Sequence, residues 1–475
     1  MAIKGRVLSV ASECVPLLKT GGLADVVGAL PAALAAEGWD MRVLMPAYRP
    51  LLPLLDGGAV LWQSDDLFGG PGRVVATSKG GMPVLLLDAP HLYDREGGPY
   101  SGPEGDWADN PQRFAALSWA GAMIMRDGLA DDWHPDILHA HDWQAGFAPA
   151  YMAYEGMEQP SVLTIHNIAF QGYASPALLA ALRLPAHQFH ADALEYYGGI
   201  SSLKAGLVTA RKITTVSPTY AEELMRPAFG MGLEGVIHAR AADVSGVLNG
   251  VDTEIWSPET AATPYSLRSF KGKAAARAAL CDEFGLEVPG PLALIISRLT
   301  DQKGIDLIPA AIPDFIAGGG GLLVLGSGDP ALEGAMQALA EAYPGRVAVR
   351  IGYDEALSQR MFAGGDAVLV PSRFEPCGLT QMYGLRYGTL PVVSAVGGLA
   401  DTVITANPAA LAVGAATGIT FAPTDTVALG QALARLLTLY ADQKTWAKMM
   451  RTAMRQPVGW ETSAATYAAL YDSLR

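Results

Sequence analysis

The chain has 475 residues, of which 50% are hydrophobic and 17% are charged, and its formal net charge is −14 at pH 7. This length exceeds what one hydrophobic core usually supports, and the composition excludes intrinsic disorder, so two or three folded domains are expected. The acidic balance argues against a general attraction to nucleic acid or to an anionic membrane surface. A phosphate compound would have to be bound locally by a few placed cations.

The three cysteines, Cys14, Cys281 and Cys377, are sparse and form no CxxC pair. Such a set is not a disulfide framework, and it fits a reducing cytoplasm. The apolar run Val7–Ala11 is interpreted as a first strand, because Glu13 ends it too early for a signal sequence. No run approaches the roughly 18 apolar residues of a membrane span. A soluble, cytoplasmic protein without membrane contact is therefore expected.

Short apolar runs alternate with helical patterns along nearly the whole chain. In the first series, the expected strands are Arg6–Ser12, Met41–Met45, Val84–Asp88, Asp136–His139, Ser161–His166 and Lys212–Val216. In the second series they are Leu292–Ser297, Gly321–Leu325, Val347–Ile351, Ala367–Pro371 and Pro391–Ala395. Runs of this kind are typical of parallel strands buried on both faces, and the alternation predicts a doubly wound α/β architecture.

The strand signal weakens over residues 249–290, where prolines are frequent, so a domain junction is predicted near Val247. The chain then divides into a Rossmann-like domain over residues 1–246, a second one over residues 247–456, and a final helical segment over residues 457–475. The two domains are expected to face each other across a cleft. Ligands of such sheets bind beyond the carboxyl ends of the strands.

Three candidate loops belong to the first series. The segment from Lys19 to Asp25, Lys-Thr-Gly-Gly-Leu-Ala-Asp, follows the first strand, and its glycines and lysine suit an anion, although a tight turn with a solvated lysine fits equally well. The segment His139–Trp143 ends another strand with two histidines on one face, either as satisfied buried residues or, less favoured, as metal ligands. Thr164–Ile168 brings a His-Asn pair to a third strand end, where an Asn-stabilised turn is the alternative.

Three further loops belong to the second series. Ser297–Gly304 carries Arg298 and Lys303, two cations that can grip a diphosphate, although a solvated face remains an alternative. Pro371–Thr380 joins a strand to a helix and places the carboxylate of Glu375 beside free helix amides. Cys377 in this loop is interpreted as a packed residue, because no histidine lies near it in the sequence. Val396–Asp401 is again glycine-rich after a strand.

Taken together, these loops resemble those of the bacterial glycogen synthases and plant starch synthases, a family with the GT-B glycosyltransferase fold. The resemblance covers nearly the full length, and its most specific motifs are Lys19–Pro31, Ser297–Gly304 and Glu375–Thr380. It implies transfer of glucose from ADP-glucose to the non-reducing end of glycogen or another α-1,4-glucan, with retention at the anomeric carbon and without a metal or other cofactor. It also implies that the final helix returns to the first domain.

The resemblance assigns roles to individual residues. Lys19 is expected to contact the nucleotide phosphates, with Gly22 and Asp25 of the same motif in the donor-binding set, and Arg298 and Lys303 are expected to stabilise the leaving ADP. The remaining implied roles fall on the sugar and the base. Glu375 holds the glucose in a pocket lined by Cys377, Gly378, Leu379 and Thr380; His166 and Asp142 lie at the reacting sugar; Tyr100 and Asn249 flank it; and Tyr353 lies near the adenine.

One position departs from the wider set of retaining GT-B enzymes, many of which have a second Glu eight residues after the first. Here that position is Tyr383, which favours the glycogen synthase branch. Front-face attack is the preferred mechanism, with Glu375 as a covalent nucleophile the less favoured version. UDP-glucose is the alternative donor, and a GT-B nucleotide-sugar epimerase is the alternative enzyme. Two other classes are disfavoured. A sugar-binding protein usually carries a secretory signal, and a nicotinamide-dependent oxidoreductase usually carries the GxGxxG fingerprint, and the sequence shows neither feature.

Overall fold

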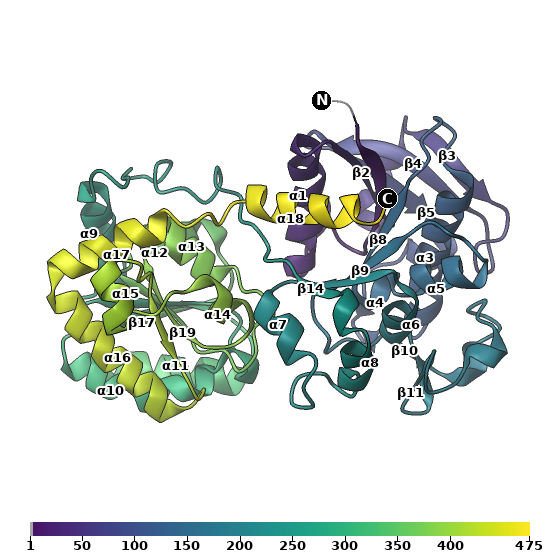
Figure 1. Ribbon diagram of the computed structural model, residues 1–475. Coiled ribbons are helices and arrows are strands. Elements are labelled where there is room, and N and C mark those ends of the chain that lie inside the picture. Colours follow the sequence, from purple (N-terminus) through teal and green to yellow (C-terminus); the bar gives the residue numbers. More distant parts are fainter. Residues whose placement is uncertain (1–2) are drawn as a thin grey trace. The chain divides into compact units, whose positions relative to one another are not determined.

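A computed structural model describes residues 3–475, and contacts group the chain into two compact units (Figure 1). The first unit contains the chain up to Val216, Ala221–Leu248 and Trp460–Arg475. The second contains Ser217–Tyr220 and Asn249–Gly459. Each unit is an α/β fold built on a mainly parallel sheet, so the predicted fold class is confirmed.

The first unit is built on a nine-stranded sheet of order β14-β13-β9-β8-β1-β2-β5-β4-β3. Its strands are β1 (Gly5–Val10), β2 (Trp39–Pro46), β3 (Ala59–Ser64), β4 (Gly72–Lys79), β5 (Met82–Asp88), β8 (Ile137–His141), β9 (Ser161–Ile165), β13 (Lys212–Thr215) and β14 (Val244–Gly246). Seven strands are parallel, whereas β4 runs antiparallel to β3 and β5. The sequence did not predict this antiparallel extension, because β3 is largely exposed and lacks a buried apolar run.

Helices complete the first unit. They are α1 (Gly22–Ala36), α2 (Pro90–Tyr93), α3 (Asn110–Asp127), α4 (Asp142–Ala145), α5 (Phe147–Tyr154), α6 (Ser202–Thr209), α7 (Pro218–Glu223, whose first residues belong to the second unit), α8 (Glu234–Ala239) and α18 (Trp460–Asp472). Small antiparallel sheets are formed by β6 (Ser101–Gly102) with β7 (Gly105–Asp106), and by β10 (Tyr173–Ala174), β12 (Gly199–Ser201) and β11 (Glu195–Tyr196).

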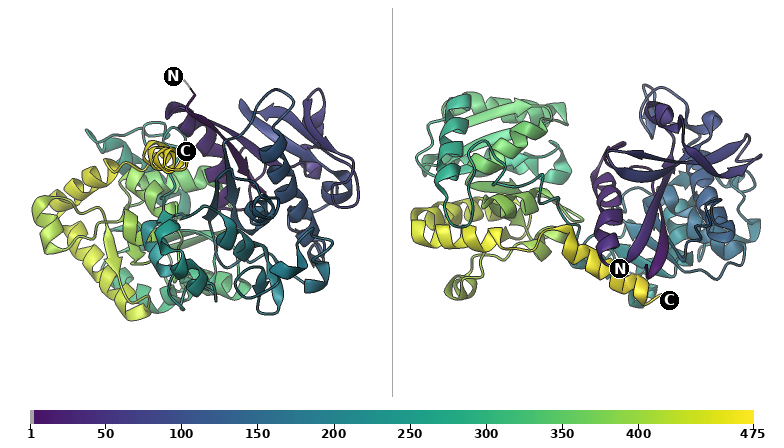
Figure 2. Two further views of the ribbon diagram at one scale, coloured as in Figure 1. Left: turned by 45° about the vertical axis from the view of Figure 1, so that its right-hand side comes forward. Right: turned by 90° about the horizontal axis from the view of Figure 1, so that it is seen from above.

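The last helix, α18, packs against the first, α1, although more than 400 residues of chain separate them (Figure 2). Trp39 at the start of β2 meets the ring of Tyr471 edge to face, with the centroids 5.2 Å apart. Tyr467 and Tyr471 are both buried in the same cluster. These aromatic contacts make the final helix part of the first unit's hydrophobic core.

The second unit has a six-stranded, wholly parallel sheet of order β17-β16-β15-β18-β19-β20. The strands are β15 (Leu292–Ile296), β16 (Gly321–Gly326), β17 (Val347–Ile351), β18 (Ala367–Val370), β19 (Leu390–Ser394) and β20 (Ile419–Phe421). Counted along the chain, this is the order 3-2-1-4-5-6 of Rossmann-type sheets. The seven parallel strands of the first unit follow the same rule, because β1 lies between β2 and β8.

Helices pack against both faces of this sheet. They are α9 (Lys271–Phe284), α10 (Ile308–Ala317), α11 (Pro330–Ala342), α12 (Glu355–Gly364), α13 (Thr380–Tyr387), α14 (Gly397–Thr402), α15 (Pro408–Val413), α16 (Thr426–Ala441) and α17 (Gln443–Met454). One core cluster joins α9, α12 and α13 to alternate residues of the strands. No helix within residues 3–475 is both long enough and apolar enough to cross a bilayer.

Several predicted strands ended in the wrong place. The run Ser161–His166 was taken one residue too far, since β9 ends at Ile165, and Asp136–His139 stopped too early, since β8 continues to His141. The error has a physical cause. Apolarity marks burial, but His139 and His141 are fully buried polar residues that still pair with the neighbouring strands.

Candidate active site

Several of the predicted site residues follow the strands at which the parallel part of each sheet reverses its order. In the first unit this point lies between β1 and β8, which precede the Lys19 loop and Asp142. In the second it lies between β15 and β18, which precede the Arg298–Lys303 loop and Glu375. A crevice opens at such a switch point because the flanking connections leave in opposite directions, and ligands of open α/β sheets bind there.

The loop between β1 and α1 is organised by Glu13, a buried carboxylate that the sequence analysis did not assign to the site. It accepts hydrogen bonds from the backbone amide and hydroxyl of Thr20 and from the amide of Gly21. It also accepts one from the hydroxyl of Tyr100, which lies 2.7 Å from the hydroxyl of Ser12. Tyr100 thus helps to hold the carboxylate on which the Lys19 loop is built. Burial raises the pKa of its phenol.

Lys19 projects from this loop and pairs with a residue of its own motif. Its Nζ lies 2.8 Å from Oδ1 of Asp25 in the first turns of α1, and the two side chains are 44% and 25% exposed. A pair this exposed is weak and can exchange for another anion. Gly22 has no heavy atom within 4 Å of an added Cβ, so packing does not require a glycine there.

Asp142 connects the ends of β8 and β9. Its Oδ1 accepts hydrogen bonds from the backbone amides of His166 at 2.7 Å and Asn167 at 3.3 Å, and this carboxylate therefore fixes the turn that carries His166. The backbone of Asp142 has a φ of +53°, a region that few residues other than glycine adopt. Burial raises the pKa of Asp142 to about 7, against the lowering effect of the two amides.

Three histidines form a buried group beside Asp142. The rings of His139 and His141 stack at 4.3 Å between centroids, as expected for alternate residues on one strand. Nδ1 of His141 lies 3.0 Å from Nε2 of His166. Burial lowers the pKa of His139 and His166 to about 3 and that of His141 well below its usual value. All three rings are therefore neutral at pH 7.

In the second unit the two predicted loops meet through an ion pair. Nζ of Lys303 lies 2.5 Å from Oε2 of Glu375, and the side chains are only 17% and 9% exposed. The hydroxyl of Ser372, which the sequence analysis did not assign a role, donates to the same oxygen at 2.8 Å. The side chain of Glu375 is therefore held in place, and Lys303 neutralises its charge.

Close backbone contacts explain the glycines around Glu375. A Cβ on Gly304 would lie 2.0 Å from the carbonyl oxygen of Pro371, so only glycine lets the lysine loop reach the end of β18. A Cβ on Gly397 would lie 2.0 Å from the carbonyl oxygen of Glu375, and one on Gly398 would lie 2.1 Å from that of Cys377. The two glycines thus let the segment Val396–Asp401 pack closely against the backbone of the Glu375 loop.

Cys377 and Asn249 are in direct contact. The thiol of Cys377 is buried and receives a hydrogen bond from the backbone of Asn249, and burial raises the pKa of the thiol to about 12. The thiol is thus protonated at neutral pH, which argues against a nucleophilic role. Oδ1 of Asn249 is buried and has no hydrogen-bond partner within residues 3–475.

The remaining predicted residues of the second unit are more accessible. Gly378, Leu379 and Thr380 are half-buried at the start of α13, where the first-turn amides have no partners within the helix. Arg298 is exposed, and its guanidinium forms no hydrogen bond or ion pair among the described residues. Tyr353 is 79% exposed, and its hydroxyl donates to Glu355 at 3.0 Å. The guanidinium of Arg298 is thus not paired with Glu375.

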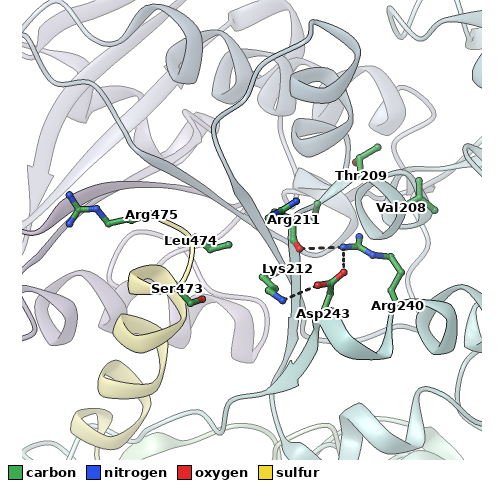
Figure 3. A pocket seen from close by; sticks show the side chains of 10 residues that line it. Val208, Thr209, Arg211, Lys212, Arg240, Asp243, Ser473, Leu474 and Arg475 are labelled. Carbon is green, nitrogen blue, oxygen red and sulfur yellow. Dashed lines mark hydrogen bonds and ion pairs between the residues drawn. The ribbon is translucent and has the colours of Figure 1, made fainter.

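A basic pocket lies elsewhere in the first unit, lined by residues around the start of β13 and the end of α18 (Figure 3). Lys212 and Arg240 there both pair with Asp243, at 2.8 and 2.9 Å. Arg240 also donates to the carbonyl of Leu207 in the last turn of α6. Lys212 and Arg240 thus stabilise the fold at the amino end of β13.

Within residues 3–475, no group of three or more His, Cys, Asp or Glu side chains is arranged to bind a metal ion.

Comparison with known proteins covers both units. Residues 6–239 match the family model of the starch synthase catalytic domain, and residues 290–439 match that of the group 1 glycosyl transferases. A glycogen synthase of Cereibacter sphaeroides is 70% identical over 472 residues, which are 99% of each chain.

Solved structures agree with these matches. The catalytic domain of Starch Synthase IV from Arabidopsis thaliana, bound to ADP and acarbose, is 30% identical with a TM-score of 0.85 over 99% of each chain. A sucrose-phosphate synthase from Thermosynechococcus elongatus, 20% identical with a TM-score of 0.61 over 99% of each chain, shares the fold alone. These structures confirm the expected GT-B fold.

Proposed function

The chain belongs to the family of bacterial glycogen synthases and starch synthases, and from this membership we propose that it lengthens an α-1,4-glucan with glucose from ADP-glucose. The observation that carries the proposal is the Lys303–Glu375 pair at the switch point of the second unit, where a sugar diphosphate needs a cation and a hydroxyl acceptor side by side. The Arabidopsis relative was solved with ADP and acarbose, which supports adenine and glucan chemistry.

The proposed donor site uses local cations in an acidic protein. The exposed guanidinium of Arg298 and the ammonium of Lys303 bind the diphosphate, which develops negative charge as the glycosidic bond breaks. Lys19 is proposed as a phosphate contact of the first unit, because its pair with Asp25 is exposed enough to exchange for another anion. Side-chain cations of this kind stabilise the leaving group, and we propose that no metal or other cofactor is required.

The glucose moiety is assigned to Glu375 and the segment that follows it. The carboxylate accepts hydrogen bonds from sugar hydroxyls, while the half-buried turn from Gly378 to Thr380 presents free amides of α13. Because Cys377 is packed beneath this turn as a neutral thiol, it shapes the pocket and takes no part in bond making.

We assign the reaction to front-face attack with retention. The acceptor hydroxyl attacks the anomeric carbon from the side of the departing diphosphate, an oxygen of that phosphate takes the hydroxyl proton, and ADP leaves. Glu375 is a poor candidate for a covalent nucleophile, because one of its oxygens is already bound by both Lys303 and Ser372. His166 and Asp142 hold the sugar ring at the reacting end.

The test is incubation with glycogen and either ADP-[14C]glucose or UDP-[14C]glucose, followed by precipitation of the polymer. We expect label in the polymer from ADP-glucose, which β-amylase releases as maltose because the new linkage is α-1,4. Label only from UDP-glucose would overturn the donor assignment. Free sugar isomers without labelled polymer would indicate an epimerase instead.

We also propose a cytoplasmic location, since all three cysteines are buried free thiols, as a reducing compartment allows.

A further inference from the structure

His166 hydrogen-bonds through one ring nitrogen to a second histidine. Nε2 of His166 faces Nδ1 of His141 at 3.0 Å, and Nε2 of His141 faces the hydroxyl of Ser9 at 3.1 Å. The three side chains come from β8, from the end of β9 and from β1, neighbours in the sheet. In a neutral imidazole one nitrogen donates and the other accepts, so the direction of one hydrogen bond in this row fixes the others.

Ser9 fixes that direction. Its side chain is completely buried, and the only hydrogen bond of its hydroxyl within residues 3–475 is the one to His141. A buried hydroxyl that accepts without donating leaves its own proton unsatisfied, which favours the donating arrangement about 10- to 100-fold. Ser9 therefore donates to Nε2 of His141, and the proton of His141 resides on Nδ1.

We propose that His141 is a positioning residue that keeps the proton of His166 on Nδ1. Nδ1 of His141 donates to Nε2 of His166, so Nε2 is the acceptor and the remaining proton of the ring is on the other nitrogen. This inference rests on the proposed function for its catalytic meaning. His166 then offers the sugar a hydrogen-bond donor, and it cannot act as the base that removes the acceptor proton.

A second contact holds the ring of His141 in place. His139 stacks on it at 4.3 Å and is itself bonded on both sides, to Tyr471 of α18 at 2.7 Å and to Thr164 at 2.6 Å. A ring fixed in this way cannot rotate to exchange its two nitrogens without breaking buried hydrogen bonds. The buried contacts of the sheet thereby determine which ring nitrogen of His166 carries the proton.

The direct test is NMR of the full-length protein labelled with 15N-histidine, with the His166 signals assigned by comparison with His166→Gln. The pattern of ring proton–nitrogen couplings distinguishes the two neutral tautomers. We expect the proton of His166 on Nδ1 and that of His141 on Nδ1. A proton on Nε2 of His166 would overturn the proposal. The measurement needs only the folded wild-type chain, so it decides the proton position even if glucose transfer is not observed.

Kinetics give a second readout. His141→Asn keeps an N–H donor near the position of Nδ1, whereas His141→Leu removes it. We expect His141→Leu to lower kcat on the order of 10- to 100-fold, as when a partner that orients a functional histidine is lost, with little change in the KM for ADP-glucose. His141→Asn should restore most of kcat, and the exposed His190→Asn serves as the matched control. Equal loss of kcat in the Asn and Leu variants would contradict a positioning role through the donor.

Discussion

Lys303→Met tests the ion pair that joins the two donor loops. The substitution keeps an unbranched side chain of similar length and removes the charge that lies 2.5 Å from Glu375. In the proposed mechanism this charge stabilises the departing diphosphate, and removal of one such donor costs about 2.7–4 kcal/mol of transition-state stabilisation. We therefore expect kcat for glucose transfer to fall roughly 100- to 1,000-fold.

The same change has a calculable effect on folding. Loss of one partner of a fully buried ion pair costs about 3–5 kcal/mol. Here the lysine is 17% exposed, and Ser372 still donates to the carboxylate, so we expect a loss nearer ~2 kcal/mol. The thermal transition of the second unit should then fall by about 4–8 °C, and the Lys303→Met/Glu375→Gln double variant should recover most of this shift.

Two measurements separate the effects. Transfer of label from ADP-[14C]glucose to glycogen gives kcat, and calorimetry gives the transition temperature. The matched control is Arg360→Met, which removes an exposed cation paired with Glu283 at 3.1 Å in the same unit and should change both values little. A Lys303→Met protein that keeps most of the wild-type kcat would refute the leaving-group role. A loss of kcat that a lower temperature restores would indicate a purely structural one.

Three further outcomes are expected. Between pH 6.5 and pH 3, unfolding lets His139, His141 and His166 take up protons while Asp142 releases one. Near pH 5 this group therefore contributes a loss of ~2.7 kcal/mol of stability for each pH unit of acidification, which urea titrations of the wild type and of His141→Leu should show as a steeper slope in the wild type. Equal slopes in the two proteins would contradict the buried neutral state. Cys377→Ser should retain most turnover, whereas iodoacetamide should inactivate the wild type slowly and in step with alkylation of this thiol; near-complete inactivity of a folded Cys377→Ser would reopen a covalent role. Transfer should persist in EDTA, because side-chain cations neutralise the diphosphate in the proposed scheme; activity that disappears and returns with Mg²⁺ would show that scheme to be wrong.

Most of the sheet framework could be predicted from the sequence because its strands are buried on both faces. Runs such as Leu292–Ile296 and Val347–Ile351 contain little that water would solvate, and they emerge as strands of the second unit. The edge strand β3 escaped prediction because its exposure removes that signal, and β4 beside it is buried only in part. Strand ends were misplaced for a different reason, because buried polar residues such as those of β8 interrupt the apolar run while the strand continues.

Candidate site residues could be proposed from the sequence where charges follow an apolar run directly, but not where a contact joins distant parts of the chain. Arg298, Lys303 and Glu375 stand out as charges at the ends of apolar runs. Glu13 also follows a strand, but its function depends on Tyr100, 87 residues further along the chain, and on a loop that folds back onto it. No spacing rule in a single sequence links these residues, and a lone carboxylate after a strand is usually solvated.

Tyr383 shows how the structure gives a physical meaning to a sequence difference. At the sequence level the residue only separates this chain from retaining GT-B enzymes with a second Glu at that position. In the structure its ring stacks on Trp256, with centroids 3.8 Å apart and planes 16° apart, and meets the edge of Phe362. A carboxylate there would face two aromatic surfaces without a hydrogen-bond donor from either ring face, which disfavours the charged form. In this chain the position is therefore part of the aromatic packing of α13 against Trp256 and Phe362.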